Sequence, residues 1–356
     1  MTRESTSARP TRIMPVGPDA IAEAKAVLAA GGLVAFPTET VYGLGADATN
    51  DAAVARLYAA KERPSFNPLI VHVADVDAAR GIAAFGDAAL RLAGAFWPGP
   101  LTLVLRRLPS CPVGMLATAG LDTVAVRVPN HRLARDVLRA FGGPVVAPSA
   151  NRSGAVSPTT AEHVRADLDG RIDLIVDDGP SPLGVESTIV ACFDSPALLR
   201  PGAVPRVAVE AVLGRAIFSP SADASSPPPV AGEGREGASA AARPRAPGMV
   251  GTHYAPRATV RMNATTVASG EALLAFGSEL PAGADRAAAV LNLSEGGFVV
   301  EAAANLFAHL RALDGRGIGT IAVMPIPEEG LGEAINDRLR HAAAPREMAA
   351  RPHARG

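Results

Sequence analysis

Cationic and hydroxyl side chains gather in a few short segments of the chain, each in or directly after an apolar run. Lys61 and Arg63 follow a helical pattern, Arg127 lies inside an apolar strand pattern, and Ser149 with Asn151 follows another apolar run. An ammonium and guanidinium forks suit phosphate and carboxylate groups, and hydroxyl and amide groups add neutral donors. Because the formal net charge is only −1, an anion site must be local rather than a basic surface.

Each of these residues also has an ordinary structural interpretation. Lys61 and Arg63 could be solvated charges that complement the dipole at a helix C-terminus. Arg127 could point to water from an alternating strand, and His72 could be a hydrogen-bonded core histidine in the apolar run 69–73. The functional interpretation is favoured because Lys61, Arg63 and His72, together with the threonines and glycines after the first strand, converge on one short segment.

The stretch from Gly31 to Val73 is the one that must position these groups. It predicts a buried strand over 33–36, ended by Pro37, which has no amide hydrogen for a sheet ladder. A helix capped by Asn50 or Asp51 then leads to a second buried strand over 69–73. Ligands of open α/β sheets bind at the carboxyl ends of strands. The first of these ends carries the polar and small residues Thr38, Glu39, Thr40, Tyr42, Gly43 and Gly45.

The rest of the first two hundred residues alternates between helical and strand patterns. Helices are expected over 19–30 with Asp19 as the cap, and over 76–84, 87–96, 131–141 and 206–213. Strands are expected over 101–105, 123–128, 144–148, 173–176, 187–190 and 198–200. Thr159 with Glu162 has the spacing of a capping box for a further helix. The pattern is that of an α/β domain.

A chain of 356 residues is too long for one ordinary core and indicates two domains. Composition changes to Ser, Pro, Gly and Ala between Ser219 and Pro247, which is typical of a linker. Beyond it, strand patterns (271–276, 288–293, 319–324) and helical patterns (302–313, 332–341) predict a small Rossmann-like α/β/α domain. The predicted division is a disordered tail 1–14, a first α/β domain 15–215, a linker 216–257, a C-terminal domain 258–345 and a tail 346–356.

Several other classes of protein are disfavoured. Two distant cysteines, Cys111 and Cys192, form neither a disulfide framework nor a metal-ligand spacing, so a reducing, cytoplasmic compartment is expected. No apolar run reaches membrane-spanning length, and the N-terminus lacks the hydrophobic core of a signal peptide. Gly232–Gly237 formally matches a dinucleotide fingerprint, but no strand precedes it and no helix follows, so it is rejected.

Seven motifs, in order and spacing, resemble the YrdC-type threonylcarbamoyl-AMP synthases in their long, two-domain form. They are FPTETVYGLG at 36–45, Lys61-x-Arg63, NPLIVH at 67–72, Ser149-x-Asn151, VESTIV at 185–190, LRPG at 199–202, and PGM with HYAP at 247–256. The resemblance covers roughly residues 15–257. It implies a YrdC-like twisted mixed sheet with helices, followed by the smaller C-terminal domain.

The resemblance also implies an activity. A nucleotidyltransferase of this kind condenses L-threonine, bicarbonate and ATP to threonylcarbamoyl-AMP and pyrophosphate, for modification of the adenosine next to the tRNA anticodon. It implies Mg²⁺ bound with the ATP, with no protein-ligated metal site, and a downstream tRNA threonylcarbamoyltransferase machinery as partner. Neither a membrane nor a stable nucleic-acid complex is expected.

By its motif matches, the resemblance implies the following roles for residues of this chain. The catalytic residues are Lys61, Arg63, Ser149 and Asn151. The ATP-binding residues are Arg63, Asn67, Thr123, Ser149, Ser157, Arg200 and Tyr254. The threonine-binding residues are Thr40, His72, Arg127, Ala147 (through its backbone) and Ser187. Tyr254 could gate the mouth of the site, or it could simply anchor the linker between domains.

Two other functions compete with this one. The first is a double-stranded RNA- or tRNA-binding module without synthase activity, which the near-neutral charge disfavours. The second is a carbamoyltransferase domain of hydrogenase maturation, but the zinc-finger and acylphosphatase-like segments expected there are missing from this sequence.

Overall fold

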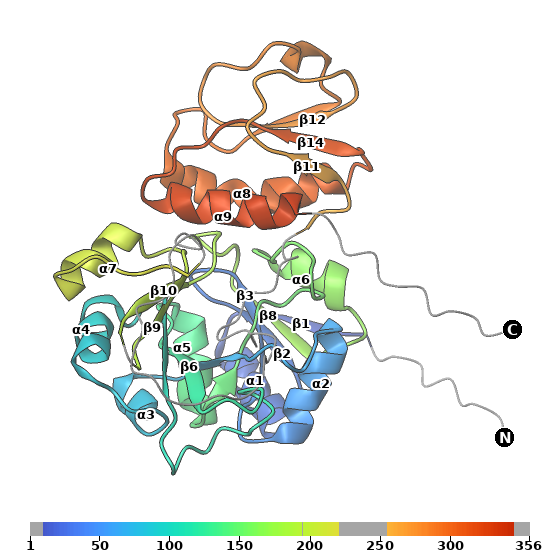
Figure 1. The fold of residues 1–356 in the computed structure, drawn as a ribbon. Helices are drawn as coiled ribbons and strands as arrows, with labels where there is room; N and C mark the ends of the chain where they lie inside the picture. Colours follow the sequence, from blue (N-terminus) through green and yellow to red (C-terminus); the bar gives the residue numbers. More distant parts are fainter. Residues whose placement is uncertain (1–9, 194, 221–254, 345–356) are drawn as a thin grey trace, which may run out of the picture.

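The structure, a computed structural model, describes residues 10–193, 195–220 and 255–344 as two α/β domains, one above the other in Figure 1. Among these residues, no helix has both the length and the apolar composition needed to cross a membrane.

The N-terminal domain is built on one mixed sheet of ten strands. In spatial order these are β1 (Arg12–Pro15), β8 (Leu174–Asp177), β2 (Val34–Pro37), β3 (Tyr42–Asp47), β7 (Val145–Val146), β4 (Ile70–His72), β6 (Thr123–Arg127), β5 (Leu101–Arg106), β9 (Thr188–Ala191) and β10 (Ala197–Arg200). β4 and β6 are parallel, and their register pairs His72 with Arg127. Two predicted site residues therefore lie side by side at the ends of adjacent strands.

Helices cover both faces of this sheet. They are α1 (Pro18–Ala29), α2 (Asp51–Lys61), α3 (Val76–Arg80), α4 (Asp87–Phe96), α5 (Arg132–Phe141), α6 (Ala161–Leu168) and α7 (Arg206–Leu213). Successive residues of a strand point to opposite faces. Val34 and Phe36 accordingly pack with α1 and α5, while Ala35 joins the larger core under α2, α4 and α6.

The C-terminal domain has a four-stranded parallel sheet in the order β11 (Thr259–Arg261), β14 (Thr320–Val323), β12 (Ala272–Ala275) and β13 (Ala289–Asn292). Helices α8 (Val299–Asp314) and α9 (Leu331–Ala343) both lie on the face toward the N-terminal domain (Figure 1). The other face packs on Ala264, Val267 and the 3₁₀ turn η1 (Ala284–Arg286). The α/β class is as predicted, but one outer layer consists of loop and a 3₁₀ turn.

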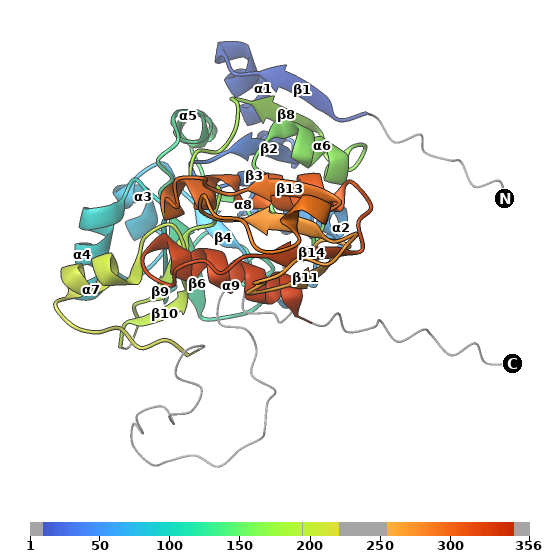
Figure 2. The same ribbon diagram turned by 90° about the horizontal axis from the view of Figure 1, so that it is seen from above.

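The two domains share one apolar core. Val41, Val156 and Val185 of the N-terminal domain belong to the same buried cluster as residues of α8 and α9. Gly184 lies directly under α8, since a Cβ added there would be 2.3 Å from the carbonyl oxygen of Ala303. Seen from above, α8 and α9 lie over the middle of the N-terminal domain (Figure 2).

Several local predictions are corrected at their boundaries. Asp19 is not the cap of α1: Gly17 precedes the helix and Pro18 occupies its first turn, a position that suits the fixed φ of proline. The capping threonine of α6 is Thr160, whose side chain accepts a hydrogen bond from His163 N, rather than Thr159. Of the two predicted caps of α2, Asn50 and Asp51, the structure has Asn50, whose side chain accepts bonds from Ala52 N and Ala53 N.

Two predicted boundaries are also too narrow. Residues 12–14 of the predicted tail, together with Pro15, form β1, which pairs in parallel with β8. At the other end, Ile217 is buried in the main core and Phe218 forms a bridge with Ala197, so the domain extends beyond 215. Most of the predicted linker and the tail 346–356 lie outside the described residues.

Candidate active site

One cavity brings together residues from six separate segments of the N-terminal domain. Its lining includes most of the predicted substrate contacts: Thr40, Arg63, His72, Arg127, Ala147, Ser149, Ser187 and Arg200. Glu186, which sequence reasoning did not select, also lines it. The cavity combines guanidinium groups, hydroxyls and a neutral imidazole in one place.

The hairpin β2–β3 supplies one wall of the cavity. The sequence predicted only a strand end here, but residues 42–47 form a second strand antiparallel to β2. Gly45 makes this possible, because a Cβ there would lie 2.7 Å from Phe36 Cε1. β3 then holds the segment before Asn151: Leu44 N donates to Pro148 O at 2.7 Å, and Ala150 N donates to Tyr42 O at 2.8 Å.

Arg127 is buried and fixed from three sides. Its Nη1 donates to Thr40 Oγ1 at 2.9 Å, its Nε donates to Gly99 O at 3.3 Å, and its Nη2 lies 2.7 Å from Glu39 Oε1. The Glu39 contact is an ion pair without good hydrogen-bond geometry, because the same atoms have no hydrogen-bond partner. The guanidinium is thus pre-oriented, and Glu39 compensates part of its charge. The position of Glu39 between two threonines gave no sequence signal for this role.

His72 is a neutral hydrogen-bonding group. Burial, followed by the positive charge of Arg127, lowers the pKa of His72 to about 3. Its Nδ1 lies 3.3 Å from Ile70 O, and a carbonyl can only accept, so Nδ1 carries the proton. Nε2 is then left as an acceptor.

Ser187 and Arg200 form a connected pair in the cavity lining. Arg200 Nη2 donates to Ser187 O at 2.9 Å and to Ser187 Oγ at 3.2 Å. The hydroxyl of Ser187 also lies 2.8 Å from Thr102 Oγ1, a buried neighbour that the sequence did not reveal. These bonds fix the orientation of the Ser187 hydroxyl within the cavity wall.

Lys61 lies behind the cavity wall rather than on it. Its side chain is 1% exposed, and its Nζ donates to the backbone carbonyls of Ser149 and Asn151. Burial, with a further contribution from Arg63, lowers the pKa of Lys61 well below its usual value. Lys61 therefore ties the end of α2 to the segment that carries Ser149.

Other predicted residues have supporting positions. Asn67 O accepts bonds from Tyr58 Oη and Arg63 Nε. The amide of Asn151 donates to Ala155 O at 2.7 Å. Thr123 begins β6, at the end of the strand opposite Arg127, and is not part of the cavity lining. Tyr254 lies outside the described residues.

Ser157 is fully buried, and its hydroxyl donates to Glu186 Oε1 at 2.6 Å. The other carboxylate oxygen of Glu186 accepts from Arg338 Nε of α9 at 2.7 Å. Arg338 is 0% exposed and comes from the C-terminal domain. The final helix gave no sequence signal that one of its arginines would reach the cavity wall.

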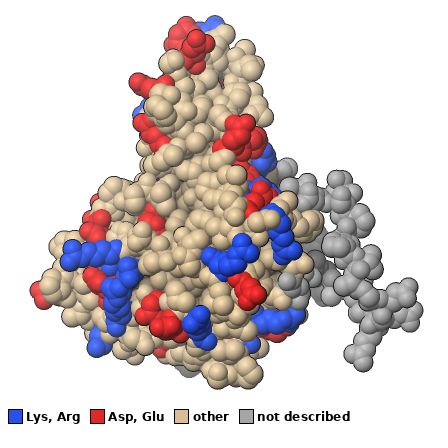
Figure 3. Space-filling view, turned by 90° about the vertical axis from the view of Figure 1, so that its left-hand side faces the viewer, with Lys and Arg blue, Asp and Glu red and all other residues tan. Residues whose placement is uncertain are grey.

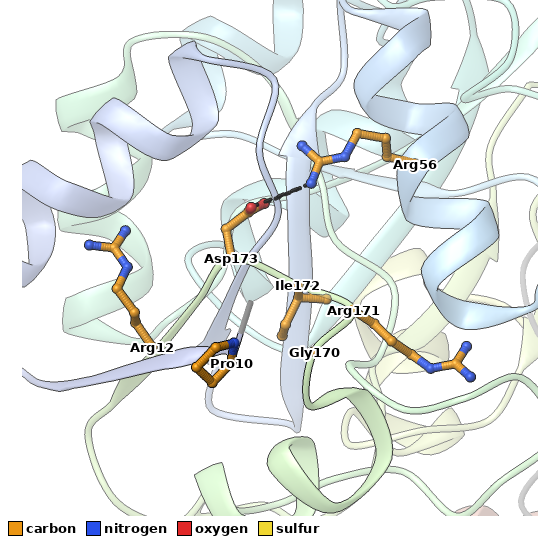
Figure 4. A pocket seen from close by; sticks show the side chains of 7 residues that line it. All are labelled: Pro10, Arg12, Arg56, Gly170, Arg171, Ile172 and Asp173. Atoms are coloured by element: carbon orange, nitrogen blue, oxygen red, sulfur yellow. Dashed lines mark hydrogen bonds and ion pairs between the residues drawn. The ribbon is translucent and has the colours of Figure 1, made fainter. Parts of the chain in front are cut away.

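A second hollow, of about 580 Å³, lies on another part of the surface near Arg12, Arg56 and Arg171 (Figure 4). Its arginines already have carboxylate partners: Arg12 pairs with Glu23, Arg56 with Asp173, and Arg171 with Glu62. This hollow lacks the hydroxyl and imidazole groups of the first cavity and is a poor candidate for an amino-acid or nucleotide site.

On the face shown in Figure 3, Lys and Arg side chains alternate with Asp and Glu and form no continuous basic area. The described residues also contain no group of three or more His, Cys, Asp or Glu side chains placed to hold a metal ion.

Comparison with known proteins agrees with this architecture. Residues 26–202 match the family model described as "Telomere recombination" (Sua5, YciO and YrdC proteins), and residues 205–344 match "Threonylcarbamoyl-AMP synthase, C-terminal domain". The threonylcarbamoyl-AMP synthase of Bacillus subtilis is 41% identical over 343 residues, which cover 92% of this chain and 93% of that protein. The Schizosaccharomyces pombe synthase is 35% identical over 87% of this chain and 85% of its own length.

Solved structures give the same result. The crystal structure of Pyrococcus abyssi Sua5 complexed with L-threonine aligns with a TM-score of 0.81 at 38% identity, covering 94% of this chain and 98% of that chain. Both domain models and full-length relatives match in order, so the chain belongs to the threonylcarbamoyl-AMP synthase family of nucleotidyltransferases, in its two-domain Sua5 form.

Proposed function

We propose that the cavity binds L-threonine beside the triphosphate of ATP and that the chain condenses them with bicarbonate to threonylcarbamoyl-AMP. The observation that carries this proposal is the convergence of Arg63, Arg127, Ser149 and His72 on one cavity. The relative from Pyrococcus abyssi that shares the fold was crystallised with L-threonine, which supports an amino-acid site.

The reaction makes one bond to carbon and exchanges one bond at phosphorus. The threonine amine adds to carbon dioxide derived from bicarbonate and loses a proton, giving a carbamate. A carbamate oxygen then attacks the α-phosphorus of ATP, and the bond from that phosphorus to the bridging oxygen breaks to release pyrophosphate. Such displacements depend mostly on positioning and on stabilisation of charge.

The threonine side of the cavity is the part containing Arg127. Its pre-oriented guanidinium binds the substrate carboxylate, while Thr40, Ala147 O and Ser187 contact the rest of the amino acid. Neutral His72 presents Nε2 as an acceptor for the amine or the hydroxyl. A site that hydrogen-bonds a substrate hydroxyl discriminates strongly against analogues that lack it.

The nucleotide side lies toward Arg63 and Ser149. Arg63 and Arg200 supply positive charge to the phosphates, and Ser149 adds a neutral donor. Lys61 and Asn151 act by holding the Ser149 segment in place, and Asn67, Ser157, Thr123 and Tyr254 are the further ATP contacts that the motifs imply. The hydroxyl proton of Ser157 is used by Glu186, so contact with phosphate requires that this hydroxyl rotate.

Magnesium enters this scheme with ATP. Glu186 of the cavity lining is ion-paired with Arg338, and Glu39 behind the lining is ion-paired with Arg127, so the protein is a poor source of ligands there. The donor set instead fits a hydrated Mg²⁺ held by phosphate oxygens. When bound, the ion would share the negative charge of the triphosphate.

The product is proposed to serve a tRNA threonylcarbamoyltransferase machinery in the cytoplasm. The predicted division into a domain 15–215, a linker 216–257 and a domain 258–345 is also part of this proposal, and Tyr254 belongs to that linker.

The proposed reaction needs no pair of nucleophile and base on the protein, so no covalent enzyme intermediate is expected. Radiolabelled ATP should leave no label on the denatured protein after turnover, and recovered label would contradict the scheme.

The direct test is release of pyrophosphate by the full chain in the absence of RNA. Release should require ATP, L-threonine and bicarbonate together. Arg127→Lys should raise the KM for threonine by about 10–100-fold, because a lysine keeps the charge but loses the fork. Arg132→Lys is the matched control, since its side chain is 95% exposed at the start of α5. Release independent of threonine, or an unchanged KM in Arg127→Lys, would contradict the proposal.

A further inference from the structure

The C-terminal domain reaches the cavity wall through one buried arginine. Arg338 of α9 has no exposed side-chain surface, and its Nε lies 2.7 Å from Glu186 Oε2. Glu186 belongs to the cavity lining, and Arg338 also pairs with Asp337 on its own helix. A charge from one domain thus neutralises a carboxylate in the active cavity of the other.

A second arginine from the same domain contacts the buried segment of Ser157, which lies behind Glu186 and outside the cavity lining. Arg311 of α8 donates through Nε to Ser157 O at 3.3 Å, and its Nη2 contacts Val156 O and Asp167. Ser157 is therefore held from two helices: directly at its backbone by Arg311, and at its hydroxyl by Arg338 through Glu186. An ion pair between Arg206 and Glu333, at 2.7 Å, fixes α9 nearby.

The buried carboxylate of Glu186 depends on the positive charge of Arg338. Burial would raise the pKa of Glu186, but the charges of Arg338 and Arg200 and the hydrogen bonds from Ser157 and Arg338 outweigh burial and lower it. A buried carboxylate that loses its partner is strongly unfavourable. Beside a triphosphate it would also repel the substrate.

We infer that Arg338 is a positioning residue for the nucleotide: it neutralises Glu186 and holds Ser157, so that the C-terminal domain completes the ATP side of the cavity. This inference rests on the proposed function, because it assumes that the Ser157 side receives the triphosphate. It assigns the C-terminal domain a direct part in the site.

The test compares two arginines on the same helix in the full chain. Arg338→Met removes the buried charge, whereas Arg340→Met removes an exposed one that pairs with Glu328. Arg338→Met should raise the Kd and the KM for Mg·ATP by about tenfold or more, with a much smaller change in the KM for threonine. Arg340→Met should leave both unchanged.

Rescue separates positioning from simple structural support. Adding Glu186→Gln to Arg338→Met removes the unpaired carboxylate and should restore most of the ATP affinity. Equal ATP affinity in Arg338→Met and Arg340→Met, or a double variant no better than Arg338→Met, would overturn the inference. If Arg338→Met does not fold, Arg338→Lys is used: it keeps the charge and should bind ATP more weakly than Arg340→Lys.

The affinity for ATP is measured by calorimetry, and this measurement does not require turnover. If wild-type protein releases no pyrophosphate with threonine and bicarbonate, the proposed function fails. If wild type is active but the arginine variants bind ATP alike, only the inference about Arg338 fails.

Discussion

His72 shows how burial can select the chemistry of a single side chain. Because its pKa is lowered to about 3, the imidazole is neutral over the physiological range and accepts a hydrogen bond instead of competing as a cation. The nearby positive charge of Arg127 reinforces this state. A sequence pattern could suggest either a core histidine or a ligand contact, and the structure shows a buried residue that also lines the cavity.

Keeping His72 neutral makes the stability of the folded chain depend on pH. Between pH of about 6.5 and about 3, the unfolded chain binds a proton at His72 that the folded chain does not, so stability falls as pH falls, by up to ~1.4 kcal/mol per pH unit. His72→Gln cannot titrate and lacks this loss.

Denaturant unfolding of both proteins at about pH 7 and about pH 5 measures the effect. The stability of wild type relative to His72→Gln should fall by about 2 kcal/mol toward the lower pH. His163, whose pKa is lowered to about 4, is common to both proteins and cancels in the comparison. A difference that stays the same at both pH values would show that His72 is protonated alike in the folded and unfolded chains.

Among the elements, the segment before β9 depends on a close approach by the turn after β10. Gly202 lies there, and a Cβ on it would be 2.4 Å from Thr188 N and 2.5 Å from Glu186 O. These are backbone atoms that cannot rotate away. The glycine of the LRPG motif is thus explained by its packing against the segment before β9, which carries Glu186 and Ser187.

Gly202→Ala should therefore displace the segment of the cavity lining that carries Glu186 and Ser187. We expect a loss of about 1–3 kcal/mol in stability, typical of overpacking, together with a lower kcat/KM. Gly94→Ala is the control, because Gly94 lies in α4 with nothing within 4 Å of its added Cβ. Thermal unfolding and pyrophosphate release measure both effects, and two variants that behave alike would contradict the packing argument.

The whole molecule has two domains that share an apolar core. Val41, Val156 and Val185 pack against the C-terminal helices. Arg311 bonds to the backbone of Ser157, and Arg338 bonds to Glu186 of the cavity lining. Removing the C-terminal domain would expose the valines and leave Glu186 without Arg338. The domain interface is therefore expected to be needed for synthesis.

A chain ended at residue 220 should lose pyrophosphate release strongly, by about tenfold or more, because it lacks both arginines. Circular dichroism should first establish that it is folded. The truncation also removes Tyr254, so Tyr254→Ala in the full chain separates a gating role from the docking of the domain. Full activity of the truncated chain would refute the requirement.

The local order of the chain could be predicted from the sequence. Apolar periodicity predicted most helices and strands, and the cap of α2 was narrowed to Asn50 or Asp51, because these signals arise from neighbouring residues. The motifs around Lys61, Ser149 and Arg200 also indicated the family, and most of the substrate contacts proposed from the motifs line one cavity. Such information is local, since each motif is a short run with its own backbone requirements.

Contacts between distant segments could not be predicted in this way. The hairpin strand β3 depends on how Gly45 packs under Phe36, and the position of Lys61 behind the wall depends on carbonyls almost ninety residues away. The pairings of Glu39 with Arg127 and of Glu186 with Arg338 join residues that no local pattern connects. Folding alone brings these charges together, because an ion pair depends on distance in space and not on separation along the chain.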